Sequence, residues 1–290
     1  MIETLHAYGK KLSLQGIQNP LEQVKQAYEY DSVEEAKSHI RIIGEEIKQS
    51  GLPAPAVFGF TGYGNVSQAA QEILDLLPVV EIIPDDLSSQ YELASRDTRN
   101  VYKVVFREEH IVKRKTGDFE LQDYYNHPEN YTSCFTQFLP FLSVVVNCIF
   151  WTEDYPRLIT REYLSRDTQI PLIVIGDISV DIEGSIEITN KATYPDKACY
   201  TFDPAKNTYE DGIADGGISI MAIDNLPCEF PRESSAAFSE ILKRYIPEIL
   251  NADYHQPMED LELSYPIKKA LILKKGVLTT EYQYMEEFLR

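Results

Sequence analysis

Residues 56–67, Ala-Val-Phe-Gly-Phe-Thr-Gly-Tyr-Gly-Asn-Val-Ser, are the most informative stretch of the chain. The apolar run predicts a β-strand, and the helix-forming segment 66–77 follows the glycines at once. In a dinucleotide-binding βαβ unit, Gly62 would permit the sharp turn, Gly64 would let the backbone approach a pyrophosphate, and Ser67 would fill the third, small position. The first N–H groups of the helix would then face the phosphates. As an isolated pattern, the stretch also fits an ordinary tight turn.

The composition is that of a soluble globular protein, with 290 residues, 43% hydrophobic and 25% charged. The net charge of −19 argues against a nucleic-acid partner, because phosphate binding needs an excess of Lys and Arg. The longest apolar run, 138–151, is too short for a membrane span. The first residues carry no signal-peptide pattern, so we expect a cytoplasmic protein with no membrane contact. The 4 cysteines are far apart, with no C-x-x-C and no His at metal-ligand spacing, which predicts neither disulfides nor a metal site.

Short apolar runs alternate with helical patterns along most of the chain. A capping box, Ser32 to Glu35, predicts a helix that Gly51 and Pro53 end. Strands are predicted at 56–60, 79–83, 101–106, 142–150, 171–179 and 217–224, and helices at 66–77, 160–165 and 231–250. Residues 107–137 are predicted to form an inserted loop or irregular helix. Because the strands are continuously apolar, they indicate a mostly parallel α/β sheet of the Rossmann type, flanked by helices.

An acidic residue follows the second predicted strand at the distance that a Rossmann unit uses. A carboxylate about 20 residues beyond the glycines binds the adenosine ribose in such units. Asp85 lies at that distance, with Glu81 and Asp86 nearby. The alternative is a solvated acidic turn. Together with the glycines, Asp85 predicts nucleotide binding.

Three later segments carry a resemblance to a known family: Val-Asn-Cys-Ile-Phe-Trp-Thr-Glu-Asp-Tyr-Pro-Arg-Leu-Ile-Thr (146–160), Gly-Asp-Ile-Ser-Val-Asp-Ile-Glu-Gly-Ser-Ile-Glu (176–187) and Ala-Ile-Asp-Asn-Leu-Pro-Cys-Glu-Phe-Pro-Arg-Glu (222–233). With residues 62–67, they resemble the lysine-ketoglutarate reductase and saccharopine dehydrogenase family, a branch of the alanine dehydrogenase and transhydrogenase group, over nearly the whole chain. The resemblance implies a helical connecting segment (1–52), an NAD(P)-binding Rossmann domain (53–228) and a C-terminal helical segment (229–290). Both helical segments would belong to a second domain that is largely absent, and the lysine and histidine that transfer protons would lie in that missing part.

The resemblance also implies roles for particular residues. The pyrophosphate would be held by Gly62, Tyr63, Gly64, Asn65, Val66 and Ser67, and the ribose by Asp85. Cys148 and Ile149 would pack near the adenosine half of the coenzyme. Ile178 and the active-site residue Asp181 would follow the next strand. Asn225 and Leu226 would lie beside the nicotinamide, and the catalytic candidate Asp224 would lie there too, near the missing proton-transfer groups.

Each catalytic or substrate-binding candidate has a structural alternative. Asp181 fits turn chemistry as well as function, and Asp177 is expected to order its own turn. Arg157 could bind a substrate carboxylate in a bidentate manner, or it could pair with Glu153 or Asp154.

The activity implied is the interconversion of L-lysine plus 2-oxoglutarate with saccharopine, by hydride transfer from NAD(P)H to an imine. The alternatives are an alanine-dehydrogenase-like or opine-type activity and a non-catalytic nucleotide-binding or regulatory subunit. Local acidity favours NAD, whereas resemblance to the reductase branch favours NADPH, with Arg96 or Arg99 available for the extra phosphate. Apolar faces on the terminal helices also suggest a homo-oligomer.

Overall fold

The computed structural model describes residues 1–94, 97–166 and 170–289. The chain divides into two compact units, Met1–Phe230 and Pro231–Arg290. The candidate residues named above all lie in the first unit. No helix in the described part of the chain is both long and apolar enough to cross a membrane.

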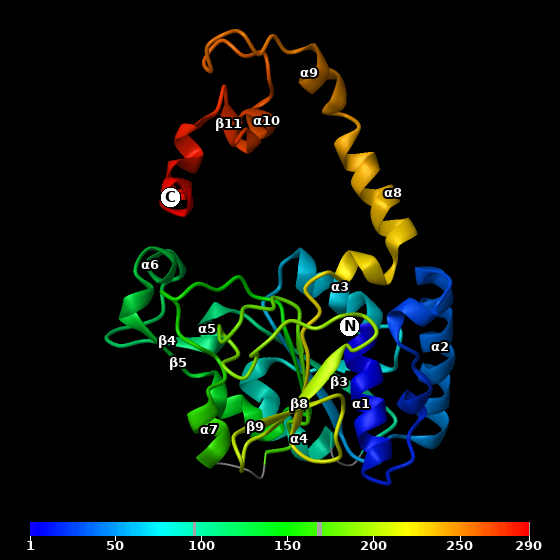
Figure 1. The fold of residues 1–290 in the computed structure, drawn as a ribbon. Helices are drawn as coiled ribbons and strands as arrows, with labels where there is room; N and C mark the ends of the chain where they lie inside the picture. Colours follow the sequence, from blue (N-terminus) through cyan, green and yellow to red (C-terminus); the bar gives the residue numbers. More distant parts are fainter. Residues whose placement is uncertain (95–96, 167–169, 290) are drawn as a thin grey trace. The chain divides into compact units, whose positions relative to one another are not determined.

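The first unit is built on a mostly parallel sheet, as predicted, which has eight strands among the described residues (Figure 1). Its strands are β1 (Ala56–Thr61), β2 (Val79–Glu81), β3 (Val101–Phe106), β6 (Val144–Asn147), β7 (Val174–Asp177), β8 (Cys199–Asp203), β9 (Thr208–Asp211) and β10 (Ile218–Met221). They follow the order β2-β3-β1-β6-β7-β10-β8-β9. The strands from β2 to β10 are parallel, and β8 and β9 are antiparallel additions at one edge. The sequence patterns did not predict this added hairpin.

Helices cover both faces of the sheet. The helices of the first unit are α1 (Ile2–Leu14), η1 (Pro20–Gln23), η2 (Ala27–Glu29), α2 (Val33–Ser50), α3 (Asn65–Leu74), η3 (Pro84–Asp86), α4 (Leu87–Ala94), α5 (Glu108–Ile111), α6 (Leu121–Asn126), η4 (Pro128–Asn130), η5 (Phe135–Phe141), α7 (Arg161–Arg166) and η6 (Leu226–Glu229). Along β1, Phe58 packs with α1, α2 and α3 in one core, whereas Val57 packs with η5 and α7 in another. Alternate residues of one strand therefore enter two cores, which explains the continuously apolar runs.

The Ser32 cap of the capping box predicted for residues 32–35 is confirmed, but the return hydrogen bond to Glu35 comes from Asp31 and not from Ser32. The N–H of Glu35 donates to Ser32 Oγ at 3.1 Å, and Glu35 in turn accepts the N–H of Asp31. The predicted loop at 107–137 contains short helices and the small hairpin of β4 (Val112–Arg114) and β5 (Tyr131–Ser133).

Residues 1–52 do not form a segment separate from the Rossmann domain, which corrects that expectation. The helix α1 lies against the sheet: the rings of Tyr8 and Phe58 are 5.5 Å apart, and Thr4 fills the space beside Gly176. A Cβ on Gly176 would lie 2.3 Å from Thr4 Oγ1, so glycine is required for this close approach. A helical pattern predicts that a helix buries one face, but it does not say against what.

The second unit is loosely packed. It contains α8 (Pro231–Leu242), α9 (Ile246–Asn251), α10 (Tyr265–Ala270), β11 (Leu273–Lys274), β12 (Val277–Leu278) and η7 (Thr280–Phe288). Among its described residues, only Leu261 and Leu263 are buried hydrophobic residues. The single helix predicted for 231–250 is two helices, because Pro247 cannot continue a helix and instead lies in the first turn of α9.

Candidate functional site

The glycine loop connects the carboxyl end of β1 to the amino end of α3. Gly62 has a φ of +85°, a conformation that favours glycine, and its N–H donates to the carbonyl of Phe106 at 2.9 Å. Gly64 has an ordinary φ of −71°, and a Cβ built on it would meet no atom within 4 Å. The space above Gly64 is therefore open, and the first N–H groups of α3 have no acceptor within the helix. This loop fits a phosphate group.

The strand β1 lies between β3 and β6, so β2 is not its neighbour. Thr61 at the end of β1 pairs with Phe106 at the end of β3, so Arg107 is the first residue beyond the neighbouring strand. The guanidinium of Arg107 lies 5.1 Å from the centre of the Tyr63 ring, over the glycine loop. In Rossmann units, the residue at this place contacts the adenosine ribose or its phosphate.

This order of strands corrects the role expected for Asp85. The strand β2 lies at the sheet edge, and its last residue, Glu81, pairs with Lys103, three residues before β3 ends. Asp85 follows in η3, exposed to solvent, with β3 between its strand and β1. The spacing along the sequence was suitable, but spacing alone does not reveal which strand is inserted beside β1.

The other charged residues considered for coenzyme choice lie elsewhere. Glu81 forms an ion pair with the buried Lys103, at 3.4 Å. Arg99 precedes β3, at the amino end of the strands, opposite the glycine loop. Arg96 lies outside the described residues.

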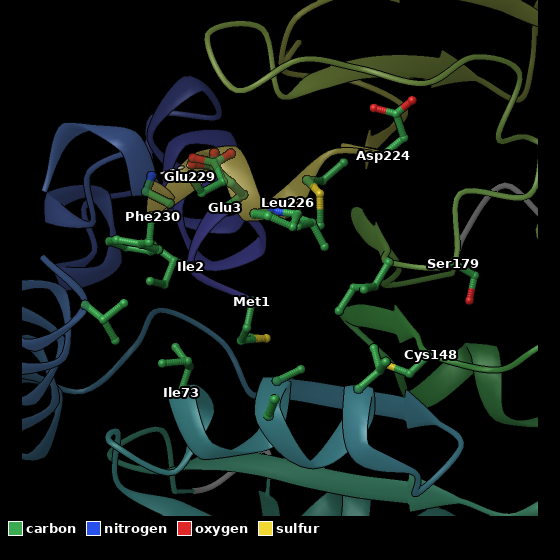
Figure 2. A pocket seen from close by; sticks show the side chains of 18 of the residues that line it. Met1, Ile2, Glu3, Ile73, Cys148, Ser179, Asp224, Leu226, Glu229 and Phe230 are labelled. Atoms are coloured by element: carbon green, nitrogen blue, oxygen red, sulfur yellow. Dashed lines mark hydrogen bonds between the residues drawn. The ribbon is translucent and has the colours of Figure 1, made fainter. Parts of the chain in front are cut away.

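Several predicted site residues line one cavity of about 830 Å³ in the first unit. They are Val66, Cys148, Ile149, Ile178, Asp181, Asp224 and Leu226. The cavity lies at the carboxyl ends of β6, β7 and β10, beside one face of α3, and Figure 2 shows Cys148, Ser179 and Asp224 around it. The lining does not include the glycine-loop residues 62–65, Ser67, Arg157 or Asn225.

A buried polar network ties together the strand ends beneath this cavity. Thr61 Oγ1 donates to Asn147 Oδ1 at 2.8 Å, and Asn147 Nδ2 donates to Asp177 Oδ1 at 2.9 Å and to Ser185 Oγ at 2.9 Å. Thr189 Oγ1 donates to the other carboxylate oxygen of Asp177 at 2.6 Å. Burial raises the pKa of Asp177. The network fixes the ends of β1, β6 and β7 relative to one another.

Asp177 and Arg157 hold the backbone of the loop that follows β7. Asp177 Oδ1 also accepts the N–H of Val180, whose φ of +54° is unusual for a β-branched residue. Arg157 donates from Nε and Nη2 to the carbonyl of Glu183, at 3.1 Å and 2.9 Å. It therefore holds the loop backbone, and neither Glu153 nor Asp154 is its partner. Asp181 lies in this loop, half-buried, and burial raises its pKa.

Two carboxyl groups that the sequence reasoning did not consider also line the cavity. Glu3 on α1 is 3% exposed and Glu229 on η6 is 5% exposed. Burial raises the pKa of both groups to about 7. No sequence pattern links two residues so far apart, since the fold alone brings them together.

The chain matches a known protein family. The sequence profile described as "Alanine dehydrogenase/PNT, C-terminal domain" matches residues 133–281. The chain belongs to this family. The matched residues include β6, β7 and β10, whose ends line the cavity, whereas the glycine loop precedes them.

Several curated proteins have sequences similar to that of this chain. The alpha-aminoadipic semialdehyde synthase of Arabidopsis thaliana is 35% identical over 98% of this chain and 28% of that protein. The mitochondrial alpha-aminoadipic semialdehyde synthase of Mus musculus is 32% identical over 99% of this chain and 33% of that protein. The saccharopine dehydrogenase [NAD(+), L-lysine-forming] of Emericella nidulans is 33% identical over 41% of this chain and 32% of that protein. The chain thus spans about a third of the length of these curated relatives.

Proposed function

We propose that the chain is the coenzyme-binding part of an NAD(P)-dependent oxidoreductase that forms or cleaves saccharopine, from L-lysine and 2-oxoglutarate. The observation that carries the proposal is the open glycine loop above the amino end of α3, at the carboxyl end of a central parallel strand. The names of the similar proteins support the substrate class.

The chain's own residues would bind and orient the coenzyme. Residues 62–67 would hold the pyrophosphate by main-chain N–H groups, and the nicotinamide half would extend toward the part of the cavity lined by Ile178 and Leu226. When bound, the nicotinamide supplies a hydride for reduction of an imine. Asp181 and Asp224 would lie near the reacting atoms, since both line this cavity. The buried network around Asn147 would keep the strand ends, and thus the coenzyme contacts, in place.

For the coenzyme, we favour NADPH over NADH. Arg107 follows the strand next to the glycine loop and is exposed, so its guanidinium can bind a 2′-phosphate in a bidentate manner. The neighbouring Glu108 accepts a hydrogen bond from Tyr125 Oη at 2.7 Å and is therefore already engaged. The acidic residues that favoured NAD lie on or beyond β2, away from this position.

Titration of the purified chain with NADPH and NADH by calorimetry tests this proposal. We expect both reduced coenzymes to bind, with NADPH tighter by about tenfold or more, as one charge-assisted bidentate contact provides. If neither NADPH nor NADH produced heat on titration, coenzyme binding would be contradicted. Tighter binding of NADH than of NADPH would contradict the role of Arg107.

An activity assay addresses the substrate class. Oxidation of NADPH by the full-length protein, with the second domain present, is followed with L-lysine plus 2-oxoglutarate and, separately, with pyruvate plus ammonia. Turnover with the first pair supports the proposal, and turnover with the second supports the alanine-dehydrogenase alternative.

Three expectations remain predictions: a second domain that includes residues 229–290, a homo-oligomer and a cytoplasmic location. The mouse relative is named as mitochondrial.

A further inference from the structure

Glu3 and Glu229 form a buried carboxyl pair at one end of the cavity. Glu3 lies on α1 and Glu229 on η6, and Figure 2 shows their carboxyl groups close together, with Asp224 across the cavity. Like-charge repulsion from Glu3 contributes to the raised pKa of Glu229, which agrees with this proximity.

Three of the four oxygen atoms of the pair have no hydrogen-bond partner. Glu3 Oε1 accepts the N–H of Ala27, but Glu3 Oε2 and both oxygens of Glu229 are buried and unpartnered. The N–H of Tyr28 lies near Glu229 without forming a hydrogen bond of good geometry. Unpartnered buried carboxyl oxygens cost free energy, so this arrangement is disfavoured unless a ligand supplies donors.

The groups that face the pair do not supply them. Glu29 on η2 faces the pair, and its negative charge raises the pKa of Glu3. The side chain of Tyr28 also faces the pair, and desolvation raises the pKa of its hydroxyl group. The amino group of Met1 also faces the pair and attracts both carboxyl groups, but it forms no hydrogen bond with the three unpartnered oxygens, and burial lowers its pKa. Cys148 lines the same cavity, and burial raises the pKa of its thiol to about 12. No Lys, Arg or His side chain belongs to the cavity lining among the described residues.

The cavity walls indicate what kind of cation fits. The apolar side chains of Ile2, Ile73, Leu226 and Phe230 line the cavity on the side of the carboxyl pair (Figure 2). Such apolar walls suit an alkyl chain and do not suit a hydrated metal ion. Moreover, no group of three or more His, Cys, Asp or Glu side chains that could hold a metal occurs in the described residues.

We infer that Glu3 and Glu229 bind the ammonium group of an aliphatic primary amine whose alkyl chain lies along the apolar walls. A primary ammonium has three N–H donors, which equals the number of unpartnered oxygens in the pair. The inference rests on the proposed function, in which the amine substrate binds beside the nicotinamide. The carboxyl pair would then hold the amine group of that substrate. The carboxyl pair is a binding element and not a proton-transfer group.

Binding of n-pentylamine, compared with the equally sized 1-pentanol, tests the inference. At pH 8 the full chain is expected to bind the amine about tenfold or more tightly than the alcohol, by ligand-observed NMR, since charge-assisted hydrogen bonds form only with the amine. Between pH 5.5 and pH 8 the amine affinity should rise, because protons on the pair must leave before the ammonium binds.

Two variants of Glu229 and one control complete the test. Glu229→Gln and Glu229→Leu should both abolish the preference for the amine, and the second should also remove the cost of a buried carboxyl and so keep the chain folded. The control Glu153→Gln changes an exposed glutamate outside the cavity and should bind as the parent chain does. Equal binding of alcohol and amine, or an unchanged amine preference in both Glu229 variants, overturns the inference.

A parallel NADPH titration separates this inference from the proposed function. Loss of amine binding with unchanged NADPH affinity in the Glu229 variants supports the amine site. Amine binding by a chain that binds neither NADPH nor NADH would refute the proposed function while leaving the amine site intact. NADPH binding without any amine preference would refute only the amine site.

Discussion

The guanidinium of Arg107 lies 5.1 Å from the centre of the Tyr63 ring. This contact joins the first residue after β3 to the glycine loop after β1, two points 44 positions apart in the sequence. It places a positive charge where a Rossmann unit meets the adenosine ribose, in a chain with a net charge of −19. A local positive charge of this kind can attract a phosphate despite the overall acidity, since charges beyond about 8 Å are screened at physiological salt.

Replacement of Arg107 should change coenzyme preference. We expect Arg107→Ala to weaken NADPH binding by about tenfold or more and to leave NADH binding nearly unchanged, because only NADPH carries the 2′-phosphate. Fluorescence titration with both coenzymes measures the effect. Arg41→Ala on α2 removes an exposed arginine far along the sequence and serves as the control. A parallel loss of NADH affinity would show that Arg107 supports the loop and does not select the phosphate.

The two glycines of the loop should respond differently to alanine. Gly64→Ala should leave thermal stability nearly unchanged, because the added Cβ meets no atom within 4 Å, but it should weaken coenzyme binding by filling the phosphate space. Gly62→Ala should lower stability by about 1–2 kcal/mol, because φ is +85° and the Cβ would lie 3.2 Å from Ile149 Cγ2. Calorimetric unfolding and coenzyme titration of both variants give the comparison. Equal coenzyme affinity in Gly64→Ala and the parent chain would argue against phosphate binding there.

Loss of the Asp177 carboxylate should destabilise the first unit. Asp177→Ala leaves the donors of Asn147, Thr189 and Val180 without their acceptor, which should cost about 2–4 kcal/mol. Urea unfolding monitored by circular dichroism measures the loss. Asp154→Ala, at an exposed position, is the matched control and should change stability little. A change of similar size in both variants would contradict the structural role of the network.

Glu229→Gln should stabilise the chain at high pH and not at low pH. Burial raises the pKa of Glu229 from 4.5 to about 7 in the folded chain, so the folded state keeps a proton that the unfolded state has released. The parent chain therefore loses stability as pH rises from 4.5 through 7, whereas glutamine does not titrate. The variant should be more stable at pH 8 by on the order of 1–3 kcal/mol, and nearly equal at pH 4.5. Thermal unfolding at both pH values checks this, and a difference independent of pH would count against a buried, protonated Glu229.

Removal of residues 231–290 should leave the first unit folded. The helices α8, α9 and α10 contain no buried residues, so their loss takes little from the core. A chain that ends at Phe230 should unfold cooperatively and keep its NADPH affinity within about twofold, since the glycine loop and Arg107 remain. Limited proteolysis of the full chain should cut first within 231–290. An insoluble or unfolded truncated chain would show instead that the first unit depends on those residues.

The local sequence was sufficient to predict the strand and the helix on either side of the glycine loop. The run 56–60, the glycines and the following helix were predicted close to their observed positions, because turn, capping and strand preferences act over a few residues. The resemblance to a known family likewise located the residues at the ends of β6, β7 and β10, and the structure brings Cys148, Asp181 and Asp224 to one cavity.

The partners of each strand and helix could not be obtained that way, because pairing between distant segments depends on the packing of the whole chain. Residues 79–81 were recognised as a strand, but only the assembled sheet shows that β3 lies between β2 and β1, which gives Arg107 the position expected for Asp85. In the same way, α1 had a helical pattern, yet only its burial against the sheet brings Glu3 beside Glu229, 226 positions later. Hydrophobic burial is not directional, so a sequence states which faces are buried and the tertiary structure alone states against which neighbours.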